Sequence, residues 1–116
     1  MKIGNREYGF RLTVGASVEV ARLCPGHDLS RIGEAVGNGY GEQAETMAKL
    51  IVALNNGYVA AEAFEGRKAH RLTLEDVLSL SPSVFAEMAN EAIRAFMGDV
   101  SGEIEVETEK KAGAEG

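Results

Sequence analysis

The feature that most constrains the fold of this chain is a helix signature that begins at Ser81-Pro82. Ser81 is a favourable N-cap residue, and Pro82 suits the first helical position. Apolar residues then recur in neighbouring pairs, one helical turn apart. The pairs are Val84-Phe85, Met88-Ala89, Ala92-Ile93 and Phe96-Met97. A helix that packs against one neighbour needs a single apolar stripe, whereas this helix carries two stripes side by side.

The doubled stripe has two interpretations that the sequence leaves open. In the first, the helix is central in the core and both stripes are buried. In the second, part of the doubled stripe faces another chain, because Met and Phe suit a surface that accepts varied apolar partners. The candidate partner-binding residues of the second interpretation are Val84, Phe85, Met88, Ala89, Ala92, Ile93, Phe96 and Met97.

The composition favours helices in the rest of the chain as well. Trp is absent and aromatic residues make up only 6% of the chain, so the core must be built mainly from aliphatic side chains and Met. A length of 116 residues fits one domain. We predict a mainly α fold: one small helical domain with an N-terminal β-hairpin over residues 1–98, and a disordered acidic tail over residues 99–116.

The first thirteen residues predict the β-hairpin. Gly4-Asn5 is a turn-forming pair. Beyond it Tyr8, Phe10 and Leu12 alternate with other residues, which places their side chains on one face. A lone hairpin is only marginally stable in water, so we expect this face to rest on the helices.

Capping residues predict where the helices begin. Thr13 is a predicted N-cap, and the helix that follows should run to Cys24 with an apolar stripe of Val14, Val18 and Ala21.

Two shorter helices have similar start signals. Asp28 is expected to cap one of them, and Thr73 with Asp76 forms a variant of the capping box before the other. Residues 67–71 form a basic connector between the central helix region and Thr73.

Glycines predict where the longer helices end. A central helix over residues 42–55 is expected to stop at Asn55-Asn56-Gly57, because Gly57 can adopt the left-handed conformation. A further short helix over residues 58–64 should end at Gly66, and the last helix should end at Gly98.

No residue pattern in the chain points to catalysis. Cys24 and His27 have a spacing that suits two metal ligands, but a structural zinc site needs four ligands and His70 is the only other His. A nucleophilic Cys also needs an activating base in a cleft, and no flanking signature supports one. We therefore predict no catalytic residue, no metal site and no cofactor, and interpret Cys24 as a buried residue at a helix end.

The glycines at positions 37, 39 and 41 do not form a phosphate-binding loop. The dinucleotide fingerprint needs a preceding strand and a different spacing, and the P-loop needs Gly-Lys followed by Ser or Thr. We predict a flexible linker here.

Charge argues against a nucleic-acid partner. The net charge is -6. Most of it lies after residue 98, where the chain contains six acidic residues and only two Lys. The basic cluster of Arg67, Lys68, His70 and Arg71 has no helix-turn-helix around it, so a solvated connector is favoured over a phosphate-binding site.

Hydropathy argues against a membrane location. The longest apolar run, residues 50–54, is too short to span a bilayer, and no apolar stretch follows Lys2 as a signal peptide would. The single Cys fits a reducing compartment, so we expect a cytoplasmic protein.

Three segments carry a resemblance to a known family. Residues 3–16 read Ile-Gly-Asn-Arg-Glu-Tyr-Gly-Phe-Arg-Leu-Thr-Val-Gly-Ala, residues 47–58 cover the central helix and its turn, and residues 72–80 read Leu-Thr-Leu-Glu-Asp-Val-Leu-Ser-Leu. Together with the amphipathic last helix and the acidic tail, they make the chain resemble the small tail assembly chaperones of long-tailed bacteriophages and prophages of Gram-positive hosts.

The resemblance implies a role without catalysis. Such a chaperone coats the long, apolar, helical tape measure protein before the tail tube forms around it, and it tends to self-associate. It works in the cytoplasm of the host bacterium and is expected to be absent from the mature virion. A longer form made by ribosomal frameshifting would recruit the tail tube protein, and Lys110-Lys111 is either part of an A-rich slippery site or a solubilising pair.

Two other classes of protein remain as alternatives. One is another small phage morphogenesis factor, such as a head–tail completion protein, which would be found in finished particles. The other is a small helical regulatory protein.

Overall fold

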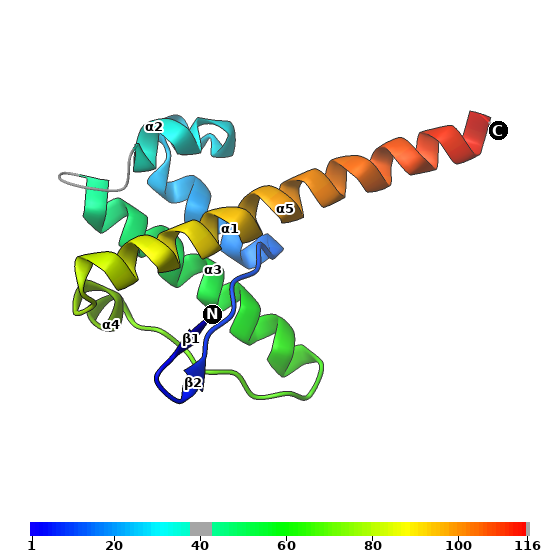
Figure 1. Cartoon of the computed structure of the whole chain (residues 1–116). Coiled ribbons are helices and arrows are strands. Elements are labelled where there is room, and N and C mark those ends of the chain that lie inside the picture. The colour runs from blue at the N-terminus through cyan, green and yellow to red at the C-terminus, as the bar shows by residue number, and fades with distance from the viewer. Residues whose placement is uncertain (38–42, 116) are drawn as a thin grey trace.

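The computed structural model describes residues 1–37 and 43–115, with side chains described through residue 100. It shows a mainly helical fold with a two-stranded antiparallel sheet at its start (Figure 1). The elements are β1 Lys2–Ile3, β2 Arg6–Glu7, α1 Val14–Leu23, η1 Pro25–His27, η2 Leu29–Arg31, α2 Ile32–Val36, α3 Ala44–Phe64, α4 Leu74–Leu78 and α5 Pro82–Glu115. The predicted fold class, a helical domain with an N-terminal hairpin, is confirmed.

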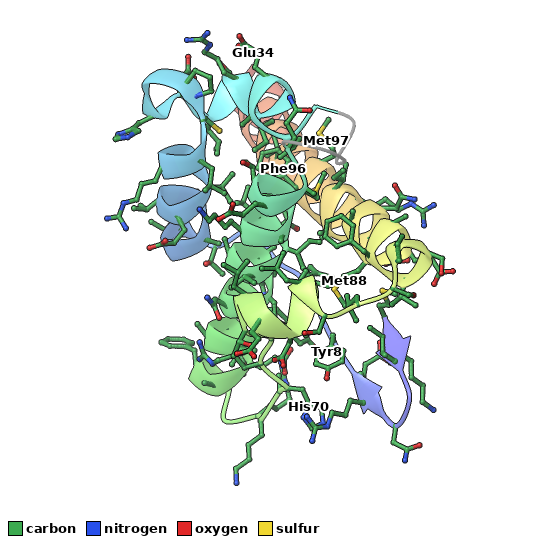
Figure 2. All side chains as sticks on the ribbon, turned by 90° about the vertical axis from the view of Figure 1, so that its left-hand side faces the viewer. Tyr8, Glu34, His70, Met88, Phe96 and Met97 are labelled. Carbon is green, nitrogen blue, oxygen red and sulfur yellow. The ribbon has the colours of Figure 1, made fainter. Side chains whose placement is uncertain are left out.

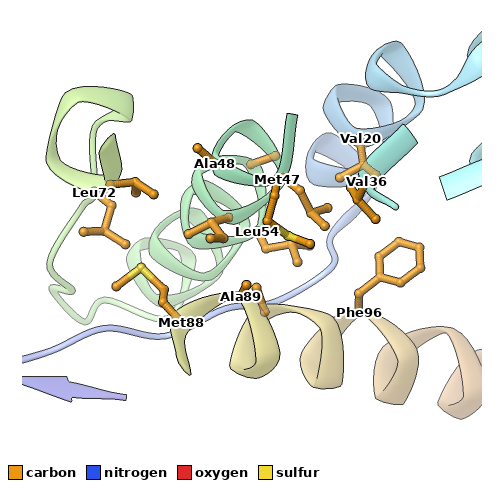
Figure 3. Close-up of a cluster of buried hydrophobic side chains, with 14 of the residues drawn as sticks. Val20, Val36, Met47, Ala48, Leu54, Leu72, Met88, Ala89 and Phe96 are labelled. Atoms are coloured by element: carbon orange, nitrogen blue, oxygen red, sulfur yellow. The ribbon is translucent and has the colours of Figure 1, made fainter. Parts of the chain in front are cut away.

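Helix α3 is the centre of the domain. Helices α1, α2, α4 and α5 all pack against it. Its fully buried Leu50, Ile51 and Leu54 meet Val20 of α1 and Met88 of α5 in one aliphatic and Met-rich core (Figure 3). Burying each such side chain stabilises the fold by roughly 1.5–3 kcal/mol.

The predicted N-caps at Thr13, Thr73 and Ser81 are confirmed by their hydrogen bonds. The Thr13 hydroxyl accepts from the backbone N–H of Ala16 at 3.1 Å. Thr73 and Asp76 form a reciprocal capping box, with distances of 3.1 and 3.0 Å. The Ser81 hydroxyl accepts from the backbone N–H of Val84, the third residue of α5, at 3.4 Å. These bonds satisfy backbone N–H groups that have no partner within the helix.

The predicted buried face of α1 is wrong. Val14 and Val18 are 84% and 47% exposed, whereas Ala16 and Val20 are buried. The face is set by close contact with α3, because Ala16 lies against Gly57. Ala16 and Val20 are one turn apart and share this face, whereas Val14 and Val18 lie on the other side of the helix and are exposed.

The predicted end of the central helix at Gly57 is also wrong. Helix α3 continues through Gly57 to Phe64. Gly57 is buried, and a Cβ atom at this position would lie 2.3 Å from the carbonyl oxygen of Arg11. Its missing side chain thus permits close approach of two backbones. The predicted stop at Gly66 is confirmed, since this residue has a φ of 80° directly after the helix.

The hairpin is shorter than predicted. Only Lys2 with Glu7 and Ile3 with Arg6 are paired. The next residues form an extended segment rather than a strand, and Tyr8, Phe10 and Leu12 pack half-buried against the core as expected. Tyr8 still exchanges two hydrogen bonds of 2.7 Å with Met1. Farther along, the segment bonds to α3: the Arg11 N–H donates to the Leu54 carbonyl at 3.0 Å.

Helix α5 does not end at Gly98 as predicted. It continues to Glu115, and its last part projects away from the body (Figure 1). Asp99 accepts a hydrogen bond from the Leu12 N–H at 2.8 Å, and Val100 packs against the core. Side chains beyond Val100 lie outside the described residues, so the disorder of the acidic tail stays a prediction. The predicted linker at residues 38–41 also lies outside the described residues.

Two truncations should separate the folded domain from its tail. Removing residues 101–116 should leave the free energy of unfolding almost unchanged. Removing residues 99–116 should lower it by about 1–2 kcal/mol, because the charged hydrogen bond from Asp99 to Leu12 and the packing of Val100 are lost. Urea denaturation of both chains measures the difference. Equal stabilities would show that neither Asp99 nor Val100 contributes to the stability of the domain.

Candidate functional site

The structure divides the candidate partner-binding residues of α5 into two groups. Most of them belong to the core, where α3 packs against the first stripe and against part of the second (Figure 3). The buried residues are Phe85, Met88, Ala89, Ala92 and Phe96. Val84 and Ile93 are half-buried, and Met97 is 55% exposed. Of the doubled stripe, Met97 therefore offers the largest accessible apolar surface.

Met97 lies at the edge of an apolar groove, which is lined by Leu29, Ser30, Ile32, Phe96, Met97 and Val100. Its lining residues come from η2, from the start of α2 and from α5. This part of α5 is close to the point at which the helix leaves the body (Figure 1). The groove is open to solvent and has a volume of about 410 Å³. In Figure 2 its labelled residues, Phe96 and Met97, lie at the end of the molecule opposite Tyr8 and His70.

The charged side chains next to the groove residues in the chain have hydrogen-bond partners of their own. Arg31 makes two hydrogen bonds to Glu34, of 2.6 and 2.9 Å, and this contact lowers the pKa of Glu34 below its ordinary value. Asp28 accepts from the N–H and the hydroxyl of Ser30, which lowers the pKa of the Asp28 carboxyl. No charged side chain lines the groove itself among the described residues. It is suited to apolar side chains and not to polar chemistry.

Sequence reasoning identified Met97 but missed the opposite wall. Leu29 and Ile32 follow the predicted N-cap Asp28, and no local signal in the sequence places them opposite α5. Val100 continues the spacing of Ile93 and Met97, at i, i+4 and i+7, and this pattern could have identified it.

Other exposed apolar residues are dispersed. Val14 and Val18 lie on α1, Phe64 ends α3 and Leu78 ends α4. Leu78 borders a smaller apolar hollow of about 160 Å³ between α4 and the start of α5. Its exposed fraction of 55% equals that of Met97, which makes Leu78 a suitable control position.

The sequence matches no family model, no curated protein and no solved structure at a significant level. Within the described part of the chain, no helix is long and apolar enough to cross a membrane.

Cys24 is placed as predicted, at the end of α1 and buried. Its thiol donates to the Val20 carbonyl at 3.3 Å, and burial raises the pKa of the thiol, with a further contribution from Asp28. A thiol held in its neutral form is a poor nucleophile. His27 is exposed, and the described residues contain no group of three His, Cys, Asp or Glu side chains that could hold a metal ion.

The basic connector is exposed, and two of its cations contact neighbouring residues. Arg67 forms an ion pair with Glu62, and its hydrogen bond lowers the pKa of the Glu62 carboxyl. Arg71 donates to the Asn56 side chain at 2.9 Å. The connector thus folds back on α3, and the apolar groove remains the strongest candidate site.

Proposed function

We propose that this chain is a tail assembly chaperone of a long-tailed phage or prophage, and that it binds the apolar, helical tape measure protein during tail assembly. The observation that carries the proposal is the apolar groove beside Met97. The family resemblance of residues 1–98 supplies the identity of the partner.

The groove fits a helix-in-groove mode of recognition. An amphipathic helix can place one or two apolar side chains between η2–α2 and α5, where Leu29, Ile32 and Phe96 would contact them. Met97 suits this role because its unbranched side chain adapts to partners of different shape. The net charge of -6 favours solubility while apolar surface is exposed.

The proposal includes three further statements about the partners and location of the protein. The chain self-associates, and a longer frameshifted form recruits the tail tube protein. Both forms act in the cytoplasm of the host bacterium and are absent from the finished virion. Mass spectrometry of purified particles tests the last statement, because a head–tail completion protein would be present in them.

Substitution of Met97 by Asp tests the groove. Met97→Asp should weaken capture of the tape measure protein encoded in the same genome by about tenfold or more, because a charge placed in an apolar contact costs several kcal/mol unless it is paired. Co-expression of the two proteins, followed by quantitative co-purification, measures the effect.

Leu78→Asp is the matched control, because Leu78 has the same exposed fraction on α4. It should leave capture unchanged. Equal loss in both variants would show that the groove is not the specific site. Failure of the unaltered chain to capture any part of the tape measure protein would overturn the proposed function.

A further inference from the structure

The last turn of α3 presents an aromatic side chain to solvent. Phe64 is 92% exposed, which makes it the most exposed large apolar side chain in the part of the chain that the structure describes. Its neighbours one turn back, Ala60 and Ala61, are too short to cover it. The Phe64 ring is therefore available for contact with another molecule.

The end of α3 holds Phe64 in a fixed position. Gly66 adopts a φ of 80°, and its N–H donates to the Ala63 carbonyl at 3.0 Å. The Arg67 N–H donates to the Glu62 carbonyl at 2.8 Å. These two bonds form a Schellman motif, which ends the helix and turns the chain. Because hydrogen bonds fix the backbone here, little conformational freedom is lost when Phe64 makes a contact.

The apolar groove beside Met97 has the size and the chemistry to receive this ring. Its volume of about 410 Å³ exceeds the roughly 150 Å³ that suffices to hold benzene in a protein cavity. Leu29, Ile32 and Phe96 line the groove with apolar groups. Met97 adds a thioether sulfur, which contacts aromatic rings favourably. An aromatic side chain is therefore a suitable occupant.

Phe64 cannot reach the groove of its own chain. The 21 residues of α3 give the helix a length of about 30 Å at 1.5 Å per residue. Its last turn lies on the side of the molecule opposite α2, whereas the start of α2 lines the groove (Figure 1). A contact between Phe64 and the groove therefore joins different parts of two copies of the chain.

The charges beside the two surfaces are complementary. Residues 62–71 contain three cationic and two acidic side chains, whereas residues 28–34 contain two acidic side chains and one cationic one. Contact between Phe64 and the groove brings opposite net charges together. Pairing of two grooves, or of two α3 ends, would bring like net charges together. Charge therefore favours Phe64 of one copy against the groove of the other.

We infer that, before the tape measure protein binds, the groove is occupied by Phe64 of a second copy of this chain, and that the tape measure protein displaces it. The inference rests on the proposed function and names what covers the groove beforehand. A contact made by one aromatic side chain buries far less area than a stable dimer does, so this association is weak and readily reversed. The groove is thus shielded from water without being permanently blocked.

Sedimentation velocity over a wide range of protein concentrations tests the contact. The unaltered chain should self-associate as its concentration rises. Phe64→Ser and Met97→Asp should each raise the dissociation constant by about tenfold or more, because each removes apolar contact at the groove. Val14→Ser is the control for Phe64→Ser, because Val14 is 84% exposed on α1 and neither substitution changes the charge. It should leave the dissociation constant unchanged.

A mixture of the two weakened variants identifies which surfaces pair. Phe64→Ser keeps an intact groove, and Met97→Asp keeps an intact Phe64. The mixture should therefore form pairs at concentrations at which neither variant associates alone. Circular dichroism checks that every variant is folded. A mixture that stays monomeric, or equal weakening by Val14→Ser, would overturn the contact between Phe64 and the groove.

Capture of the tape measure protein distinguishes this inference from the proposed function. Phe64→Ser should capture it at least as well as the unaltered chain, because no second copy competes for the groove. Reduced capture by Phe64→Ser would contradict displacement. An unaltered chain that is monomeric throughout and still captures the tape measure protein would overturn the inference and leave the chaperone proposal standing. Association that needs Phe64 and Met97, without any capture, would overturn the chaperone proposal and leave the contact between copies standing.

Discussion

Replacing Asn55 by Leu should lower the free energy of unfolding by roughly 3 kcal/mol, although the two side chains have similar sizes. Asn55 is completely buried in the middle of α3. Its amide nitrogen donates to the carbonyl oxygens of Gly9 and His70 at 3.1 and 3.3 Å. Its oxygen accepts from the Leu72 N–H at 2.7 Å. One side chain thus holds two separate segments of backbone against α3.

Leucine would leave all three backbone groups without this partner. Each buried polar group that loses its hydrogen bond costs about 1–3 kcal/mol, and the Leu72 N–H is the most deeply buried of the three. Urea denaturation with linear extrapolation measures the loss.

Asn56→Leu serves as the control for Asn55→Leu. Asn56 is only half-buried, and its side chain bonds to the exposed Arg71. Its replacement should cost less than about 1 kcal/mol. Similar losses in the two variants would contradict the structural role of Asn55.

Replacing Gly57 by Ala should destabilise the protein by about 2–3 kcal/mol. In an open helix the same change stabilises by up to about 1 kcal/mol, because Ala has the higher helix propensity. Here the new Cβ would lie 2.3 Å from the Arg11 carbonyl oxygen and 3.0 Å from the Ala16 side chain. Because the nearer atom belongs to the backbone, the extended segment must move, and the hydrogen bond from Arg11 to Leu54 is strained.

Gly98→Ala is the matched control for Gly57→Ala. Gly98 also lies inside a helix, but a Cβ atom at this position would have no atom from outside its local helix within 4 Å. This substitution should stabilise the chain by roughly 0.5–1 kcal/mol. Thermal denaturation of both variants should therefore give shifts of opposite sign. Shifts of the same sign and size would show that Arg11 and Ala16 lie farther from Gly57 than described.

The helix starts could be predicted from the sequence, and several of the ends could not. Capping at Thr13 and Thr73 depends on residues within three positions of one another, so the sequence contains all the information needed. Gly57 and Gly98 looked like helix stops because Gly favours such positions. Gly57 instead serves a contact with Arg11, which lies far away in the chain and cannot be inferred from local spacing.

The same distinction applies to the candidate site. The exposed position of Met97 follows from a stripe wider than one neighbouring helix can cover. The opposite wall at Leu29 and Ile32 depends on how α2 folds back toward α5. Asn55 was interpreted as part of a turn, because a buried Asn is recognisable only once its backbone partners are known.

The attachment of the connector through Asn55 has an evolutionary consequence. The Asn55 side chain bonds to the carbonyl oxygen of His70 and to the N–H of Leu72. The bond to residue 70 would form with any side chain at that position, because it involves only the backbone carbonyl. The exposed contacts of Arg67 and Arg71 contribute little to stability. Related chains can therefore exchange these basic residues freely, and the connector can acquire new surface charge without loss of the fold.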